Sequence, residues 1–340
     1  MNAPRARVVR RPVHGVLLLD KPRGLSSNDA LQKCKWLLRA EKAGHTGTLD
    51  PLATGVLPLC FGAATKFSQL HLDADKTYEA VAVLGVRTTT GDAEGEVVSE
   101  RPVPAITSQQ LQNLQARFTG ALRQLPPMHS ALKKDGKALY EYARAGQDVE
   151  RESRDITVHA LQLALGEEGG RAVLRFTAGV SKGTYIRTLG EDLGEALGCG
   201  AHLSFLRRIA TGPFDVGQCT TIEALEAASE SQRLATLLPV ESLLGSHPRV
   251  QLAAQEAGRF LSGLRRRGAW SDASAVAVFG DEPPALLGTG HVKAGELIPG
   301  RLLSPIDIQQ ILGSQGPVPT SVPAGHAPGQ EPAHPGGETE

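Results

Sequence analysis

The chain has 340 residues, of which 41% are apolar and 21% charged, an ordinary globular composition with material for about two domains. Its 36 basic and 36 acidic residues balance to a formal net charge of zero. This balance excludes a uniformly basic nucleic-acid binder but allows one with locally concentrated charge. The four cysteines lack metal-binding CxxC spacing, and no apolar run reaches the roughly 18 residues of a membrane helix. We therefore expect a soluble, cytoplasmic protein without a disulfide framework, structural zinc site or secretory signal.

The two ends of the chain differ in composition from its middle. Residues 1–12 carry four arginines and no acid, which favours a solvated basic arm over one that contacts phosphates. Residues 314–340 contain six prolines and five glycines, with no Lys, Arg, Phe, Tyr or Trp. Such a segment cannot bury enough apolar surface to offset its ordering entropy, so we predict a disordered tail.

Between these ends, apolar residues recur with periods of two and of 3.6, which predict strands and helices. Ser26, with Asp29 three residues later, predicts the start of a helix that extends toward Gly44. Two more helices are expected, one lined by residues 111–118 and one by residues 186–197. Strands are expected over residues 16–19, 78–84, 156–165, 172–177 and 203–209.

The order of these elements indicates the fold class. Helices and strands mix without a strict βαβ rhythm, which favours α+β over a doubly wound sheet. In the strand at 203–209, alternation predicts Leu203 and Phe205 on one face and Leu206 on the other.

A change of composition near residues 246–249 predicts a second, smaller unit. A short helix over 252–261 is followed by short strands around 276–279, 286–288 and 297–298. These elements predict a small β-rich accessory module. The run Arg265-Arg266-Arg267 within it is typical either of a solvated face or of a phosphate contact.

The segment GHTGTLDPLATGVLPL, residues 44–59, is the most informative stretch of the chain. By spacing alone, Asp50 followed by Pro51 is typical of a helix N-cap and first helical residue. His45 is by the same standard an ordinary loop histidine. The segment matches no phosphate-binding loop, GxSxG elbow or HExxH helix.

Five segments in this order resemble the TruB family of tRNA pseudouridine synthases. They are LDKPRGLSS (19–27), the loop at 44–59, KTYEA (76–80) with LG (84–85) and TTTGD (88–92), PPMHSALKKDGKALYEYAR (126–144), and VSKGTYIRTLGEDLGEALGCGAHLSFLRR (180–208). The fourth is similar to the RNA-clasping thumb of that family. The resemblance covers residues 13–245 and continues more weakly into the C-terminal module.

The resemblance implies a role for each matching residue. Asp50 corresponds to the catalytic carboxylate, Tyr78 to the tyrosine that stacks on the target uracil, and Arg187 to the partner of the aspartate. Tyr185 and Leu206 line the pocket, and His45 occupies the space that the extruded nucleotide leaves. Lys21 and Pro22 match the motif that supports the catalytic loop.

Elementary chemistry is consistent with these roles. Pseudouridylation breaks the N1–C1′ bond of uridine, turns the uracil and rejoins it through C5, so it needs no redox change or external energy source. A poorly solvated pocket raises the pKa of a carboxyl group, and a nearby Arg favours the charged form. A uridine in a folded loop must be flipped into such a pocket and held by aromatic and apolar walls.

The resemblance further implies an α+β pseudouridine-synthase fold with a mixed, mostly antiparallel sheet and a central cleft. We expect a basic arm at 1–12, a catalytic domain at 13–245 with a thumb-like insert at about 125–152, a PUA-like RNA-binding module at 246–306 and the tail at 314–340. The implied activity is isomerisation of uridine 55 in the T-arm (TΨC loop) of tRNA by a stand-alone bacterial-type enzyme. No metal, organic cofactor, membrane or obligate protein partner is implied, and we expect a monomer.

Two other function classes remain open from the sequence. One is an RNA-binding chaperone that folds tRNA, with its chemistry secondary. The other is a hydrolase with an aspartyl nucleophile, which would require a second carboxylate and metal ligands close to Asp50. The nearest acids in sequence, Glu41 and Asp73, form no such motif.

Overall fold

The structure is a computed structural model that describes residues 9–314. Apart from Ser314, the predicted disordered tail lies outside the described residues, as do residues 1–8 of the predicted basic arm. Among the described residues, no helix is both long enough and apolar enough to cross a membrane.

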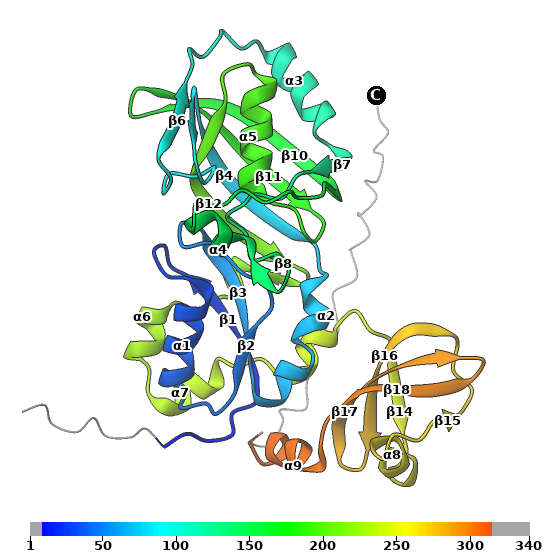
Figure 1. Cartoon of the computed structure of the whole chain (residues 1–340). Coiled ribbons are helices and arrows are strands. Elements are labelled where there is room, and N and C mark those ends of the chain that lie inside the picture. Colours follow the sequence, from blue (N-terminus) through cyan, green and yellow to red (C-terminus); the bar gives the residue numbers. More distant parts are fainter. Residues whose placement is uncertain (1–8, 315–340) are drawn as a thin grey trace, which may run out of the picture.

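A nine-stranded sheet forms the larger part of the molecule (Figure 1). Its main path runs β1-β3-β12-β4-β11-β10-β7, with β2 beside β3 and β13 beside β12. Every pairing in it is antiparallel except that between β3 and β12. This confirms the predicted α+β class with a mixed, mostly antiparallel sheet. The strands are β1 Gly15–Lys21, β2 Ala43–His45, β3 Thr54–Phe61, β4 Lys76–Leu84, β7 Gly120–Gln124, β10 Arg154–Glu168, β11 Arg171–Val180, β12 Ala201–Thr211 and β13 Phe214–Asp215.

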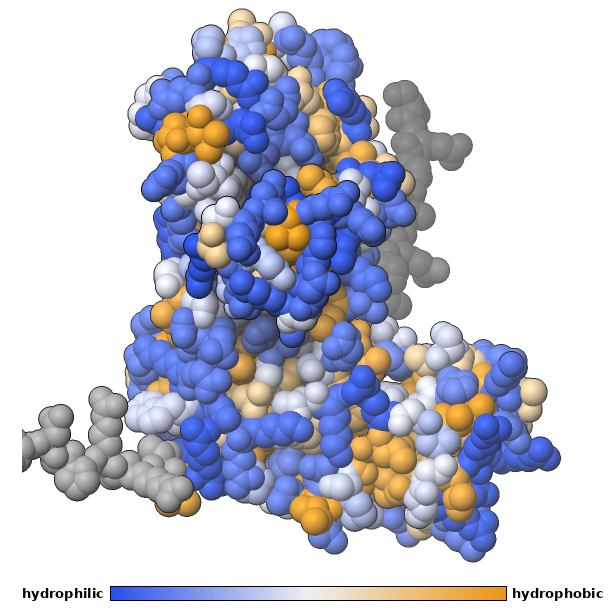
Figure 2. All heavy atoms as spheres, in the orientation of Figure 1, coloured by the Kyte–Doolittle hydropathy of each residue, from blue (hydrophilic) through white to orange (hydrophobic). Residues whose placement is uncertain are grey.

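Helices and two small hairpins cover this sheet. Gly190 and Gly194 allow α5 to lie close to the sheet, because an added Cβ would meet Leu203 or Ala201 within 2.7 Å. Hydrophilic residues coat the segment that carries β8 and α4 (Figure 2). The helices are α1 Ser27–Leu37, α2 Ser68–Leu72, α3 Ser108–Arg117, α4 Leu139–Arg144, α5 Ile186–Ala196, α6 Ile222–Ala227 and α7 Glu230–Ala235, and the hairpins are β5 Val86–Thr88 with β6 Val97–Glu100 and β8 Lys133–Lys134 with β9 Lys137–Ala138.

Helix α1 begins as predicted and ends earlier. The Asp29 amide donates to Ser26 Oγ at 3.1 Å, which confirms Ser26 as the N-cap. The helix stops at Leu37, because Arg39 takes a positive φ of 52°. The chain then enters β2, which contains Gly44, so the expectation of a helix up to that glycine was wrong.

The predicted alternation in β12 was also wrong. Leu203 and Leu206 are both buried in the core of the sheet, whereas Phe205 is 39% exposed. The pairing register between β12 and β4 shifts between Leu203 and Phe205. This β-bulge inserts one extra residue, which moves the side chains after it to the opposite faces.

The C-terminal module contains the five-stranded sheet β14-β16-β17-β18-β15. Arg265 and Arg267 both pair with Glu296, at 3.5 Å and 3.0 Å, and Arg266 pairs with Glu256. Apolar residues of this module and of β1, β3 and η1 (Gly62–Lys66) form one continuous core. The module's elements are β14 Arg249–Leu252, α8 Ala254–Leu261, β15 Arg266–Arg267, β16 Ala273–Asp281, β17 Pro284–Lys293, β18 Glu296–Leu302 and α9 Pro305–Ser314.

Candidate active site

A cleft of about 860 Å³ opens where β4, β12, the start of α5 and the loop before β3 meet. This volume lies in the usual range for a small-molecule site. Six of the eight residues singled out from the sequence line the cleft: His45, Asp50, Tyr78, Tyr185, Arg187 and Leu206. Lys21 and Pro22 do not.

Hydrogen bonds to the backbone fix the loop on both sides of Asp50. Ser27 Oγ lies 2.7 Å from the Leu49 amide nitrogen and 3.0 Å from the Leu49 carbonyl oxygen. The Gly24 amide donates to the Pro51 carbonyl at 2.8 Å. After Asp50 the chain makes a turn, closed by the Ala53 amide at 3.0 Å, and enters β3. No helix begins at Pro51, so interpreting Asp50 as a helix N-cap was wrong.

Lys21 is the last residue of β1, and its side chain is fully buried. Its ammonium group donates to the carbonyls of Pro22 at 2.9 Å and Leu25 at 2.6 Å. Burial lowers the pKa of Lys21 to about 8, although the charge of Asp50 acts in the opposite direction. Lys21 thus holds the turn that presents Gly24 to the loop carrying Asp50, and in the β1–β3 pairing it lies opposite Gly55.

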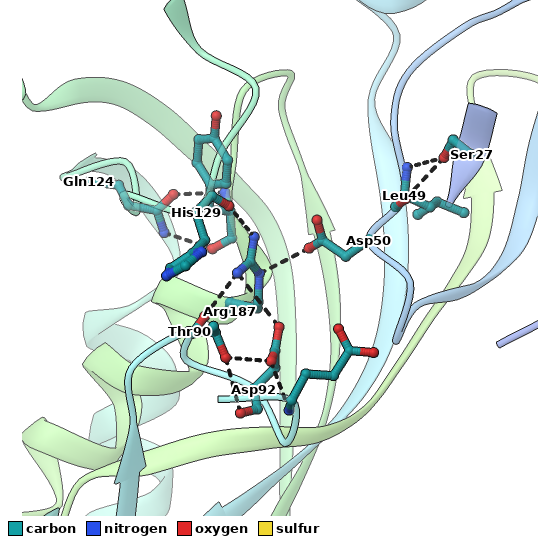
Figure 3. A network of polar contacts seen from close by, with 10 residues as sticks. Ser27, Leu49, Asp50, Thr90, Asp92, Gln124, His129 and Arg187 are labelled. Atoms are coloured by element: carbon teal, nitrogen blue, oxygen red, sulfur yellow. Dashed lines mark hydrogen bonds and ion pairs between the residues drawn. The ribbon is translucent and has the colours of Figure 1, made fainter. Parts of the chain in front are cut away.

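Asp50 and Arg187 form an ion pair inside the cleft (Figure 3). Arg187 Nε lies 2.9 Å from Asp50 Oδ2. The other guanidinium nitrogens donate to the carbonyls of Thr90 at 2.8 Å and His129 at 2.7 Å. Arg187 is only 5% exposed. The partners of its side chain come from three separate segments of the chain, and together they fix its orientation.

Opposing influences act on the pKa of Asp50. Burial raises it, the Arg187 guanidinium lowers it, and the charge of Asp92 raises it again; the result is a pKa above the ordinary value for aspartate. Removing the ion pair would leave the burial effect without its main opposition.

Asp92 is a second carboxylate at this site, and the sequence analysis assigned it no role. It is 3% exposed, and its Oδ2 lies 3.6 Å from Arg187 Nη1. Thr90 Oγ1 and the Glu94 amide donate to its other oxygen at 2.6 Å and 3.1 Å. The TTTGD motif contains Asp92, but its proximity to Arg187 depends on a contact across 95 positions of the chain.

Tyr78 and Leu206 come from neighbouring strands. In the pairing of β4 with β12, Tyr78 is opposite Arg208 and Ala80 is opposite Leu206. Residues two apart on a strand point to the same face, so the Tyr78 ring and the Leu206 side chain lie on the cleft side. Both are largely buried, which provides one aromatic and one apolar wall.

Tyr185 and His45 lie at the ends of secondary-structure elements. Tyr185 is the N-cap residue of α5, half-buried, and its pKa is raised by burial. His45 ends β2, and burial followed by the charge of Arg208 lowers its pKa, which favours a neutral ring. Its Nδ1 has no hydrogen-bond partner among the described residues.

The side chain of Gln124 holds the backbone of Tyr185 in place by two hydrogen bonds. Gln124 Nε2 donates to the Tyr185 carbonyl at 3.0 Å, and the Tyr185 amide donates to Gln124 Oε1 at 2.8 Å. We expect Gln124→Leu to lower the free energy of unfolding by about 1–3 kcal/mol, because both backbone groups would lose their partner in a partly buried position. Urea titration measures the change. Gln109→Leu is the control, since the side-chain amide of Gln109 donates to the exposed Asn113. The loss of stability there should stay within about 0.5 kcal/mol. Equal losses in both variants would contradict the assigned role.

Among residues 9–314, no group of three or more His, Cys, Asp or Glu side chains could hold a metal ion. The structure does bring a second carboxylate, that of Asp92, close to Asp50. However, both carboxylates pair with the same residue, Arg187. The arrangement is therefore a carboxylate–guanidinium–carboxylate network that faces a cleft.

Comparisons with known proteins match most of the chain to a single family. Residues 35–186 match the family described as TruB family pseudouridylate synthase (N terminal domain). Residues 187–245 match the tRNA pseudouridylate synthase B C-terminal domain, and residues 248–303 match pseudouridine synthase II TruB, C-terminal. The chain belongs to the TruB family of pseudouridine synthases.

Two relatives are similar to this chain over most of its length. The tRNA pseudouridine synthase B of Verminephrobacter eiseniae is 63% identical, over 92% of this chain and 96% of that protein. The protein of the same name from Ralstonia nicotianae is 60% identical, over 88% of this chain and 96% of that protein.

Two solved structures share the fold at lower identity. A chain of the H/ACA RNP bound to a substrate RNA containing 2′-deoxyuridine has a TM-score of 0.62 and 25% identity, over 86% of each chain. A chain of a Cbf5-Nop10-Gar1 complex has a TM-score of 0.63 and 27% identity, over 87% of this chain and 86% of that one.

Proposed function

We propose that this chain converts uridine to pseudouridine at position 55 in the T-arm of tRNA, with Asp50 as the catalytic carboxylate. One observation carries the proposal. Asp50 is held by a buried arginine at 2.9 Å in a cleft that Tyr78 and Leu206 also line. High identity to proteins named tRNA pseudouridine synthase B, over most of their length, supports the choice of substrate.

The arrangement suits an isomerisation at one flipped nucleotide. The Tyr78 ring and the Leu206 side chain offer the uracil an aromatic face and an apolar wall. Asp50 reaches the nucleotide from the opposite loop and acts on the sugar or the base, by attack or by proton abstraction at C2′. Arg187 keeps the carboxylate oriented and favours its charged form. The glycosidic bond is then broken at N1 and reformed at C5.

The other assignments belong to the same proposal. Tyr185 completes the pocket wall, His45 fills the space that the flipped nucleotide leaves, and Lys21 with Pro22 supports the catalytic loop. Residues 13–245 form the catalytic domain, with the segment at 125–152 as an RNA-clasping thumb. Residues 246–306 form a PUA-like RNA-binding module. The enzyme acts as a cytoplasmic monomer, without a metal or organic cofactor.

The test is to incubate the purified chain with unmodified tRNA in the presence of a chelator and to map pseudouridine by mass spectrometry. We expect one pseudouridine, at position 55, and the same product from an isolated T-arm hairpin. No pseudouridine in either RNA would refute the proposed function. Product at another position alone would refute the proposed site.

A further inference from the structure

Arg208, on β12, is a buried cation without a counter-charge. Its side chain is 1% exposed and its Nε donates to the Val56 carbonyl at 2.7 Å. Its Nη2 has no hydrogen-bond partner among residues 9–314, and no carboxylate pairs with it there. A guanidinium remains charged in proteins, and buried charges are normally paired. An unpaired group of this kind requires an explanation.

The guanidinium borders the cleft that contains Asp50. Arg208 lies opposite Tyr78 in the pairing of β12 with β4, so both side chains project from the same face. Gly47, in the catalytic loop, has a φ of 115°, and a Cβ added there would lie 3.8 Å from Arg208 Nη1. At Gly47 the loop therefore passes the guanidinium without a side chain between them.

Lys76 is a second cation on this side of the cleft. It precedes Tyr78 by two residues on β4, which directs its side chain to the same face. Its ammonium group donates to the carbonyls of Leu72 at 2.8 Å and Ala74 at 2.5 Å, and no carboxylate pairs with it among the described residues. Burial, followed by the charge of Arg208, lowers the pKa of Lys76 to about 8, although the charges of Asp73 and Asp75 act in the opposite direction.

The acids that border the cleft are engaged elsewhere. Asp73 pairs with Lys182 at 3.0 Å, Asp155 with Arg123 at 3.7 Å, and Asp50 with Arg187. Among the described residues, Arg208 and Lys76 thus have no carboxylate paired with them at the cleft where a polyanionic substrate would enter.

We infer that Arg208 and Lys76 bind one backbone phosphate of the RNA, that of the nucleotide whose uracil lies against Tyr78. The inference rests on the proposed function and adds a phosphate subsite to it. Tyr78 and Arg208 lie opposite each other in the sheet, where Cβ atoms are about 5 Å apart, so the two side chains are neighbours on one face. The planar fork of arginine matches phosphate oxygens, and lysine adds a point charge.

The experiment uses T-arm hairpins in which one phosphate at a time is replaced by a neutral methylphosphonate. Binding is measured with the full chain carrying Asp50→Asn, which prevents turnover. We expect one linkage, next to the target uridine, at which the replacement weakens binding about tenfold or more, the usual scale for a charge-assisted hydrogen bond. With Lys76→Met or Arg208→Met added, the same replacement should cost less than about threefold further.

Lys66→Met is the matched control, because Lys66 pairs with Asp307 at 2.9 Å outside the cleft. It should leave the tenfold effect intact. If Arg208→Met fails to fold, the subsite is tested by two measurements: the methylphosphonate series with the Asp50→Asn chain, and the same series with Lys76→Met added. A flat scan, or an undiminished penalty in Lys76→Met, would overturn the subsite. Pseudouridine formation by the unaltered chain on the unmodified hairpin is measured in parallel, so a flat scan beside normal turnover overturns the subsite alone.

Discussion

Replacing Asp50 with Asn is expected to reduce pseudouridine formation by more than about 10²–10⁴-fold, the range for loss of a general base. Asn has no carboxylate oxygen to attack carbon or take a proton. The fold should survive, because the contacts that fix the loop use the backbone of Leu49, Asp50 and Pro51. Single-turnover assays and a thermal melt on the same preparations measure both quantities.

Asp307→Asn is the matched control, since it removes a carboxylate that pairs with Lys66 outside the cleft. Its turnover should remain near that of the unaltered chain. Activity of Asp50→Asn within about tenfold of that level would contradict a catalytic role for Asp50. An unaltered chain that folds tRNA without forming pseudouridine would favour the chaperone alternative.

Replacing Arg187 with Met is expected to lower both turnover and stability while affecting tRNA affinity much less. The substitution removes the partner of Asp50 and of the buried Asp92 at once. Breaking a buried pair typically costs about 3–5 kcal/mol, because the remaining charge is uncompensated. Urea titration measures the loss of stability, and single-turnover assays measure the loss of rate.

The pH dependence gives a more specific readout for Arg187. Asp50 must be ionised to act, so activity falls as the pH drops through its pKa, which is already raised in the intact protein. Arg187→Met removes the main influence that lowers this pKa, so the acid limb of the rate profile should move to higher pH.

Arg207→Met is the control for the pH profile, because Arg207 pairs with Asp20 at 2.7 Å and is not among the residues that line the cleft. Its acid limb should not move. An Arg187→Met profile identical to that of the unaltered chain would mean that Arg187 does not act on Asp50.

Local sequence patterns were sufficient to predict many of the longer elements of the fold. Ser26 with Asp29 predicted the start of α1, because a cap uses only neighbouring groups. Alternation located most strands of the main sheet, and motif resemblance identified six residues that converge on one cleft. These features depend on short stretches of chain or on motifs that remain recognisable in sequence.

The remaining features arise from contacts between distant segments. The bulge in β12 depends on pairing with β4, so alternation alone misplaced Phe205. Asp92 joins Arg187 only when the hairpin after β4 meets α5. Arg208 lacks a carboxylate partner because no acid among residues 9–314 reaches it. A side chain's environment is set by whatever packs against it, and one-dimensional spacing carries no information about such neighbours.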